Sequence, residues 1–325
     1  MVQDYKTGVL KPINFNQIRD AVPEIRKFNY KIDVESFRPV LDSSNMQPEH
    51  WVKIAKLIEK HYDNYTGFVI LHGSDTLAYT ASALSFMLQH LGKPVILTGS
   101  QLPVGEVRTD AKENLITSIE IAATTINGKA VVPEVCVYFD YLLFRGNRTS
   151  KVNASKFEAF QSVNYSPLAE AGVHLKFNHH LLLNKPTKKL RVHTSLDSNI
   201  GIVKIFPGMT RAWFAAQLNI KGIKAIVLET FGSGNAPSSD WFIDELQQAI
   251  KNGLVVINIT QCHGGTVEQG VYATSTRLLS LGVIGGADLT TEAALTKLMF
   301  LFGTQTKVSE IKRIMKQSIC GEQTV

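Results

Sequence analysis

Polar side chains that could cap a helix or bind a ligand follow an apolar run at 67–71. Ser74, Asp75 and Thr76 stand between this run and a helical pattern. One interpretation is a helix cap, because these residue types accept hydrogen bonds from the free N–H groups of a first turn. The other is a ligand site, because the same N–H groups and the helix dipole favour a bound anion such as a substrate carboxylate. Taken alone, the pattern leaves both interpretations open.

Lys151 is the second feature with catalytic potential. It follows the strongly apolar stretch 135–144 at a short distance. Lysines in loops are usually solvated, but burial lowers the pKa of a lysine from about 10.4 and allows it to act as a base. A neighbouring carboxylate such as Asp75 would raise that pKa again and orient the amine. A hydroxyl, a lysine and an aspartate together form a nucleophilic device that needs no histidine.

Two further polar turns follow apolar residues. Asp42 and Ser43 come after Val40 and Leu41, and Gln101 closes a small polar turn after the apolar run 94–98. Singly they are interpreted as a helix cap and a turn. Ligands of open parallel sheets bind at the carboxyl ends of strands, however, so these turns also lie where a binding site is expected.

The arrangement of apolar runs predicts the elements that position these side chains. Runs of strand length alternate with stretches of helical spacing, which is typical of parallel sheets covered by helices. The fold class is therefore α/β, with two α/β domains whose sheets are mostly parallel. We expect an N-terminal domain over 1–185 that carries most of the site, a linker over 186–200 and a smaller C-terminal domain over 201–325. The expected strands are 67–71, 94–98, 135–139, 201–205, 225–228 and 254–259, and the expected helices are 47–62, 77–91, 114–124, 213–217, 241–252 and 289–302.

Composition excludes several classes of protein. The chain has 325 residues, 44% of them apolar, and a formal charge of +6, without a long basic run that would favour nucleic acid. Its three cysteines show no CxxC spacing, so we expect neither a disulfide framework nor a metal site, and a reducing cytoplasm fits best. Nucleotide-binding glycine motifs and membrane-length apolar stretches are missing, so no nucleotide cofactor and no membrane partner are expected.

The sequence blocks around these residues closely resemble the L-asparaginase family. The blocks are Asp42-Ser43-Ser44, His72-Gly73-Ser74-Asp75-Thr76, Arg145-Gly146-Asn147-Arg148-Thr149-Ser150-Lys151 and Gly285-Gly286-Ala287-Asp288. The longer blocks 79–87 and 234–237 resemble its cytoplasmic, type I branch. The resemblance implies hydrolysis of L-asparagine to L-aspartate and ammonia without metal or cofactor. It also implies a homodimer or a dimer of dimers.

The resemblance also assigns roles to residues of this chain. Ser74, Asp75 and Lys151 match the catalytic positions, with serine standing where the family has threonine. Serine keeps the hydroxyl but loses the methyl group that restricts χ1. The substrate-binding set implied is Asp42, Ser43, Ser74, Asp75 and Gln101, in which Ser43 holds the substrate α-carboxylate and Asp75 its α-amino group.

The N-terminal residues depart from the family pattern. The family begins with a strand that leads into Thr-Gly-Gly-Thr-Ile-Gly and supplies a nucleophilic hydroxyl, and the 325 residues contain no such motif. Residues 1–8 instead resemble the lid loop that follows it, with Tyr5 as a lid tyrosine. We therefore expect the motif directly before Met1, or else a protein that lacks its first strand.

Three functions remain open at this point. The leading hypothesis is an L-asparagine amidohydrolase that uses a hydroxyl nucleophile and the Lys151, Asp75 and Ser74 triad. The alternative is an asparagine- or aspartate-binding protein that has lost the nucleophile strand and its activity. A third is an amidase component that supplies ammonia from glutamine to a partner enzyme, which would predict an additional partner-binding domain.

Overall fold

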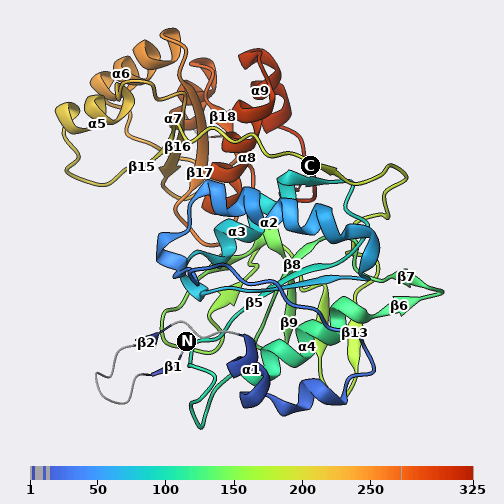
Figure 1. Ribbon diagram of the computed structural model, residues 1–325. Helices are drawn as coiled ribbons and strands as arrows, with labels where there is room; N and C mark the ends of the chain where they lie inside the picture. The colour runs from blue at the N-terminus through green and yellow to red at the C-terminus, as the bar shows by residue number, and fades with distance from the viewer. Residues whose placement is uncertain (1, 4–9, 12–14, 272, 325) are drawn as a thin grey trace. The chain divides into compact units, whose positions relative to one another are not determined.

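The computed structural model describes residues 2–3, 10–11, 15–271 and 273–324 (Figure 1). The chain divides into two compact units, residues 1–192 and 193–325. Both units are α/β, which confirms the predicted fold class. The expected linker 186–200 contains the short strand β14 (Arg191–Val192), which pairs with β4 (Leu88–Gln89) in the first unit. Within the described residues, no helix has the length and apolar character needed to cross a membrane.

A six-stranded mixed sheet forms the centre of the first unit. Three neighbouring strands run parallel, and the remaining three extend the sheet in antiparallel fashion. The middle parallel strands are fully buried because helices cover both faces, as their continuous apolar sequences predict. The order across the sheet is β13 (Leu175–Phe177), β12 (Ala169–Ala171), β9 (Leu142–Arg145), β8 (Val135–Phe139), β5 (Val95–Thr98) and β3 (Phe68–Leu71).

Helices lie on both faces of this sheet. Figure 1 shows α2 (Pro48–His61) and α3 (Leu77–Met87) on one face and α4 (Ala111–Ala123) on the other. Helix α1 (Phe15–Ala21) and the turn that follows it pack on the outer side of α4 through Val22 and Ile25. The remaining elements of this unit are short: β1 (Val2–Gln3), β2 (Leu10–Lys11), β6 (Thr125–Ile126), β7 (Lys129–Ala130), β10 (Ser150–Lys151) and β11 (Phe160–Gln161).

Helix α3 is shorter than the sequence predicts. The apolar spacing predicted a helix over 77–91, whereas α3 ends at Met87. Leu88 then pairs with Val192 in the antiparallel pair β4–β14, and His90 adopts a φ of +60°. A left-handed residue cannot continue an α-helix, so the apolar residues beyond Met87 are buried through a strand pair and a turn.

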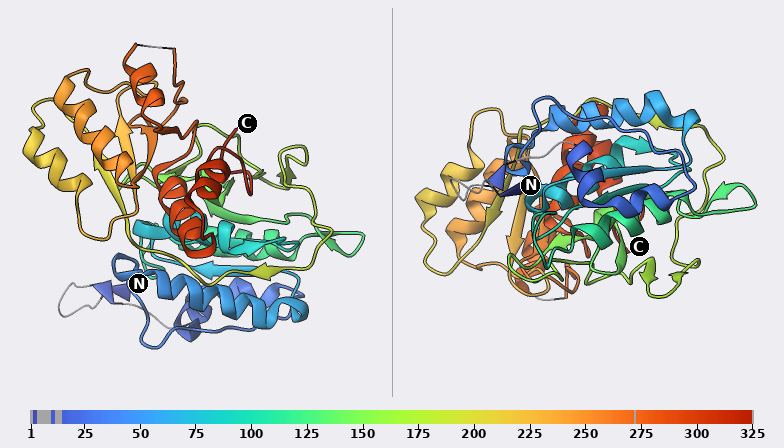
Figure 2. Two further views of the ribbon diagram at one scale, coloured as in Figure 1. Left: turned by 90° about the horizontal axis from the view of Figure 1, so that it is seen from above. Right: turned by 60° about the horizontal axis from the view of Figure 1, so that its bottom comes forward.

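The second unit is built on a four-stranded parallel sheet. Its order is β15 (Ile200–Lys204), β16 (Ala225–Thr230), β17 (Val255–Thr260) and β18 (Ile284–Gly285). The strands predicted from 201, 225 and 254 are thereby confirmed as β15, β16 and β17. The helices of this unit, seen from a second side in Figure 2, are α5 (Arg211–Leu218), α6 (Asp240–Lys251), α7 (Ala273–Ser280), α8 (Thr291–Thr304) and α9 (Val308–Met315).

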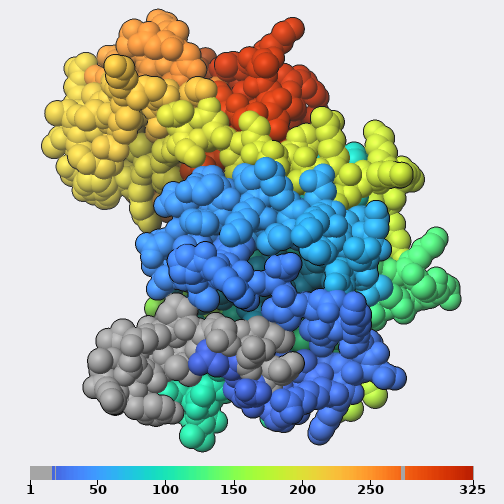
Figure 3. Space-filling model, in the orientation of Figure 1, coloured from blue at the N-terminus to red at the C-terminus, as the bar shows by residue number. Residues whose placement is uncertain are grey.

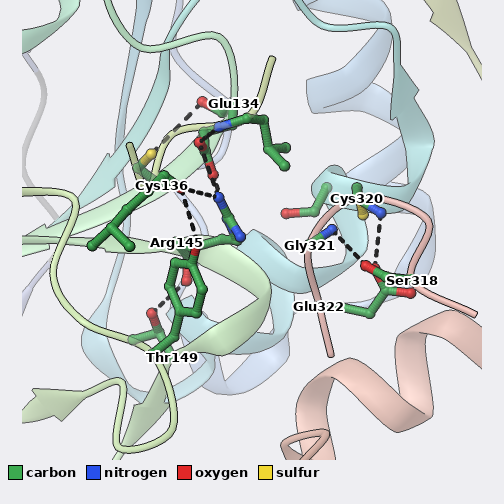
Figure 4. Close-up of polar contacts among 12 residues, drawn as sticks. Glu134, Cys136, Arg145, Thr149, Ser318, Cys320, Gly321 and Glu322 are labelled. Atoms are coloured by element: carbon green, nitrogen blue, oxygen red, sulfur yellow. Dashed lines mark hydrogen bonds and ion pairs between the residues drawn. The ribbon is translucent and has the colours of Figure 1, made fainter. Parts of the chain in front are cut away.

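A buried ion pair joins α8 to the C-terminal segment. Lys297 Nζ lies 2.6 Å from Glu322 Oε1, and both side chains are fully buried. The backbone N–H groups of Ile319 and Cys320 also donate to the Glu322 carboxylate, and Figure 4 shows the turn that brings them there. Burial alone would raise the pKa of Glu322, but the ammonium and these donors hold that pKa below its ordinary value. The pair therefore fixes the C-terminal segment against α8.

Replacing Lys297 with methionine should destabilise the fold strongly. The variant leaves a buried carboxylate without its cation, which costs about 3–5 kcal/mol of unfolding free energy. Urea unfolding followed by circular dichroism measures the loss. Lys221→Met at an exposed position is the matched control and should change stability by less than about 0.5 kcal/mol. Equal stability of Lys297→Met and the parent would show that the ion pair does not hold this segment.

Candidate active site

The turn after β3 does not use its polar side chains as helix caps. Ser74, Asp75 and Thr76 form a single 3₁₀ turn before α3, and neither this turn nor α3 receives a side-chain cap bond. The three side chains bond to other segments instead. The capping interpretation is therefore wrong here, and the side chains are directed toward residues from elsewhere in the unit.

Lys151 is the centre of the cluster that results. Its Nζ donates to Ser74 Oγ and to Asp75 Oδ1, each at 2.8 Å. The lysine side chain is only 19% exposed, whereas that of Asp75 is 66% exposed. The ammonium group is thus enclosed at one end of the cluster, and the carboxylate borders solvent where a ligand can reach it. Lys151 therefore makes a hydrogen bond to each of the other two predicted catalytic residues.

Gln101 fixes the direction of the Ser74 hydroxyl. Ser74 Oγ donates its proton to Gln101 Oε1 at 3.2 Å, because a carbonyl oxygen has no proton to give. The Ser74 oxygen then accepts from the Lys151 ammonium. Gln101 Nε2 in turn donates to the Lys156 carbonyl at 3.0 Å. The bonds form a directed chain from lysine to serine to glutamine, which polarises the hydroxyl.

Two structural features hold Lys151 in place. Its own strand, β10, pairs antiparallel with β11, with Lys151 opposite Phe160. Before it, Thr149 Oγ1 donates to the Arg145 carbonyl at 2.8 Å. Arg145 forms a buried ion pair with Glu134, in which Nε and Oε2 are 2.6 Å apart (Figure 4). The segment that delivers the lysine is therefore anchored to the start of β8.

Ser43 lies directly against the same turn. Thr76 Oγ1 donates to the Ser43 carbonyl at 2.7 Å. A Cβ atom at Gly73 would come within 2.5 Å of Ser43 Oγ, so only glycine allows this approach. The predicted substrate-binding residue Ser43 is thus adjacent to Ser74 and Asp75.

Asp42 performs the capping role that its sequence context suggested. Its Oδ1 accepts from the backbone N–H and the hydroxyl of Ser44, both at 2.9 Å. These donors lower the pKa of Asp42 below its ordinary value. Its carboxylate is occupied in shaping the turn that presents Ser43, and its predicted contact with substrate remains a prediction.

Asp110 and Asn114 support the site and were not predicted from the sequence. The Asp110 carboxylate accepts from the backbone N–H groups of Gln101 and Leu102. Asn114 Nδ2 donates to the Gly99 carbonyl and to Asp110. The two lie four residues apart at the start of α4, and this spacing beside a polar turn is the signal that could have identified them.

A buried chain of hydrogen bonds supports the end of β3 from behind. His72 Nδ1 lies 2.7 Å from the Gly73 carbonyl, which requires a proton on Nδ1. His72 Nε2 therefore accepts from Thr80 Oγ1, whose oxygen accepts from Trp51 Nε1, each at 2.9 Å. Burial lowers the pKa of His72 below its ordinary value of 6.5. Because the folded state resists protonation, the stability that the neutral imidazole contributes is complete above that value and declines as the pH falls below it.

Replacing Thr80 with valine should destabilise the first unit by about 1–3 kcal/mol, because His72 Nε2 and Trp51 Nε1 would be buried without partners. Urea unfolding at neutral pH provides the measurement. Thr80→Ser keeps the hydroxyl and serves as the control, with a smaller loss. If serine and valine destabilised the protein equally, the lost methyl packing and not the hydrogen-bond chain would be responsible.

Two further points concern the predicted lid residue and metal binding. Tyr5, the predicted lid residue, lies outside the described residues. Among those that are described, no group of three or more His, Cys, Asp or Glu side chains is arranged to hold a metal ion.

The fold and the site define a two-domain α/β protein with a lysine, serine and carboxylate cluster at the carboxyl ends of its parallel strands. Residues 1–183 match the family described as asparaginase, N-terminal, and residues 199–315 match the glutaminase/asparaginase C-terminal domain. L-asparaginase 1 of Escherichia coli K12 is 45% identical over 307 residues, which cover 93% of this chain and 86% of that protein. The chain belongs to the asparaginase family.

Two further relatives have different names. A component of the glutamyl-tRNA(Gln) amidotransferase of Pyrococcus horikoshii is 34% identical over 99% of this chain and 73% of its own length. The crystal structure of L-asparaginase I from Vibrio cholerae superimposes with a TM-score of 0.86 and 38% identity, covering 95% of this chain and 92% of that one. Relatives with names of different activities thus each match more than 90% of this chain.

Proposed function

We propose that the chain hydrolyses the side-chain amide of L-asparagine to give L-aspartate and ammonia. The observation that carries this proposal is the contact of Lys151 Nζ with both Ser74 Oγ and Asp75 Oδ1. An enclosed amine next to a hydroxyl can activate the hydroxyl, and a partly exposed carboxylate can bind an ammonium group. L-Asparagine offers an amide and an α-ammonium group of matching charge.

The proposed reaction has two steps. The Ser74 oxygen attacks the amide carbon while the hydroxyl proton passes through Lys151 to the departing nitrogen, so that ammonia leaves and an ester forms. Water then attacks the ester, aspartate is released and the hydroxyl is restored. Asp75 binds the α-ammonium group, and Ser43 binds the α-carboxylate. Backbone N–H groups near a developing oxyanion typically contribute a few kcal/mol of transition-state stabilisation.

Replacing Lys151 with methionine should abolish ammonia release and leave the fold intact. Loss of a positioned acid–base group typically lowers kcat by about 10²–10⁴-fold. A coupled ammonia assay with L-asparagine measures the rate, and circular dichroism reports the fold. The control is Lys176→Met, which removes an exposed lysine from strand β13 and should retain the parent rate. Turnover by Lys151→Met at the parent rate would exclude Lys151 from the reaction.

One observation favours a second candidate, a binding protein for asparagine or aspartate. The Ser74 hydroxyl donates its proton to the side-chain amide oxygen of Gln101, which is not a base. A protein with this arrangement could hold the amino acid through Asp75 and Ser43 without cleaving it. Calorimetric binding of L-asparagine without ammonia release would support this candidate and contradict the enzymatic one.

The proposal extends to the setting of the reaction. We infer a homo-oligomer, as a dimer or a dimer of dimers, acting on free L-asparagine in the cytoplasm. The support is the similarity to L-asparaginase 1 of Escherichia coli. The relationship to an amidotransferase component keeps glutamine as a competing substrate, which the same ammonia assay distinguishes.

A further inference from the structure

A basic segment closes the first unit. Between residues 171 and 192 the chain contains four lysines and one arginine, and it contains no aspartate or glutamate. The formal charge of this segment is therefore +5, whereas that of the whole chain is 34 − 28 = +6. Cations gathered in one stretch raise the local positive potential and attract anions. The segment thus carries a surplus of positive charge that the reaction proposed above does not use.

A cavity lies between this segment and the hairpin formed by β6 and β7. Its volume is about 450 Å³, which is typical of sites for small organic ligands. Lys129 of the hairpin and Lys185 of the basic segment both line it. The other polar residues of its lining are His179, Asn127 and Asn184. In Figure 3 the hairpin stands out at the right edge of the first unit. The lining therefore combines two ammonium groups with side chains that can donate hydrogen bonds.

Both walls of the cavity are fixed by local structure. The hairpin turns at Asn127 and Gly128, whose φ values of +53° and +71° are those of a tight two-residue turn. On the other wall, the Leu183 N–H donates to Glu134 Oε1 at 2.8 Å. Glu134 belongs to the buried ion pair with Arg145, so the backbone shortly before the second lysine is anchored to the start of β8. The two lysines are therefore held on fixed backbone before any ligand binds, which reduces the entropy lost on binding.

The two lysines of the cavity have no carboxylate partner. Among the described residues, neither Lys129 nor Lys185 forms an ion pair or a side-chain hydrogen bond. Another exposed lysine of the same unit, Lys112, is paired with Glu24. Like charges beside one cavity repel each other, and a bound anion removes that repulsion. The cavity is therefore complementary to negative charge.

We propose that this cavity binds a small organic phosphate. A phosphate group presents several acceptor oxygens and a concentrated negative charge, which suits two ammonium groups and the N–H donors of Asn127 and Asn184. Leu182 and Leu183 line the same cavity, and their apolar side chains would contact the organic part of the ligand. A concave site of this volume favours a molecule that enters it over a flat membrane surface. The inference is independent of the reaction proposed above.

Isothermal titration of the full chain with phenyl phosphate at low ionic strength tests the site. Lys129→Met and Lys185→Met should each weaken binding by about tenfold or more, since each removes a charged hydrogen-bond donor. Lys251→Met removes the same charge from an exposed position in α6 and should bind like the parent. Inorganic phosphate should bind the parent more weakly than phenyl phosphate, because it lacks the organic part. Added salt should weaken binding of both probes, since the lysines are exposed and their attraction is screened.

Three outcomes would overturn the proposal. The first is the absence of phenyl phosphate binding to the parent. The second is an equal loss of affinity in Lys251→Met, because the attraction would then come from the net charge and not from the cavity. The third is cosedimentation with phosphatidic acid vesicles without binding of phenyl phosphate, because the occupant would then be a membrane surface. Circular dichroism of Lys129→Met and Lys185→Met should match the parent, so that lost binding reports the site and not the fold.

Discussion

The rest of the candidate site depends on the hydrogen bonds that the enclosed ammonium group of Lys151 donates. It holds Ser74 and Asp75 together, although lysine and serine are 77 residues apart in the chain. The cluster forms because β3 and β5 end at the same edge of the sheet and because the β10–β11 pair brings Lys151 to that edge. Gly73 allows the Ser43 turn to approach without a steric clash. Sheet order, one glycine and one lysine therefore produce the cluster of Lys151, Ser74 and Asp75.

Much of the fold could be predicted because apolar runs mark buried parallel strands directly. The starts of β3, β5, β8 and β16 follow from such runs. The end of α3 could not be predicted, because the residues after Met87 are equally apolar in a helix and in a strand pair. That choice depends on Val192, which lies far away in the sequence.

The contacts of the candidate site could be predicted only in part. Ser74, Asp75 and Lys151 could be identified from residue type and position, and the structure brings them into contact. The hydrogen-bond chain from Trp51 through Thr80 to His72 could not be identified, because Trp51 and Thr80 follow ordinary helical spacing.

Binding of L-aspartate tests the central claim most directly, because it probes the cluster without requiring turnover. Isothermal titration should show binding to the parent chain, and Asp75→Asn should weaken it by about tenfold or more, since a charge-assisted hydrogen bond to the α-ammonium group is lost. Asp63→Asn, at an exposed position after α2, should bind like the parent. Equal affinity in Asp75→Asn and the parent, or no binding to the parent, would contradict an amino acid site at Ser74, Asp75 and Lys151.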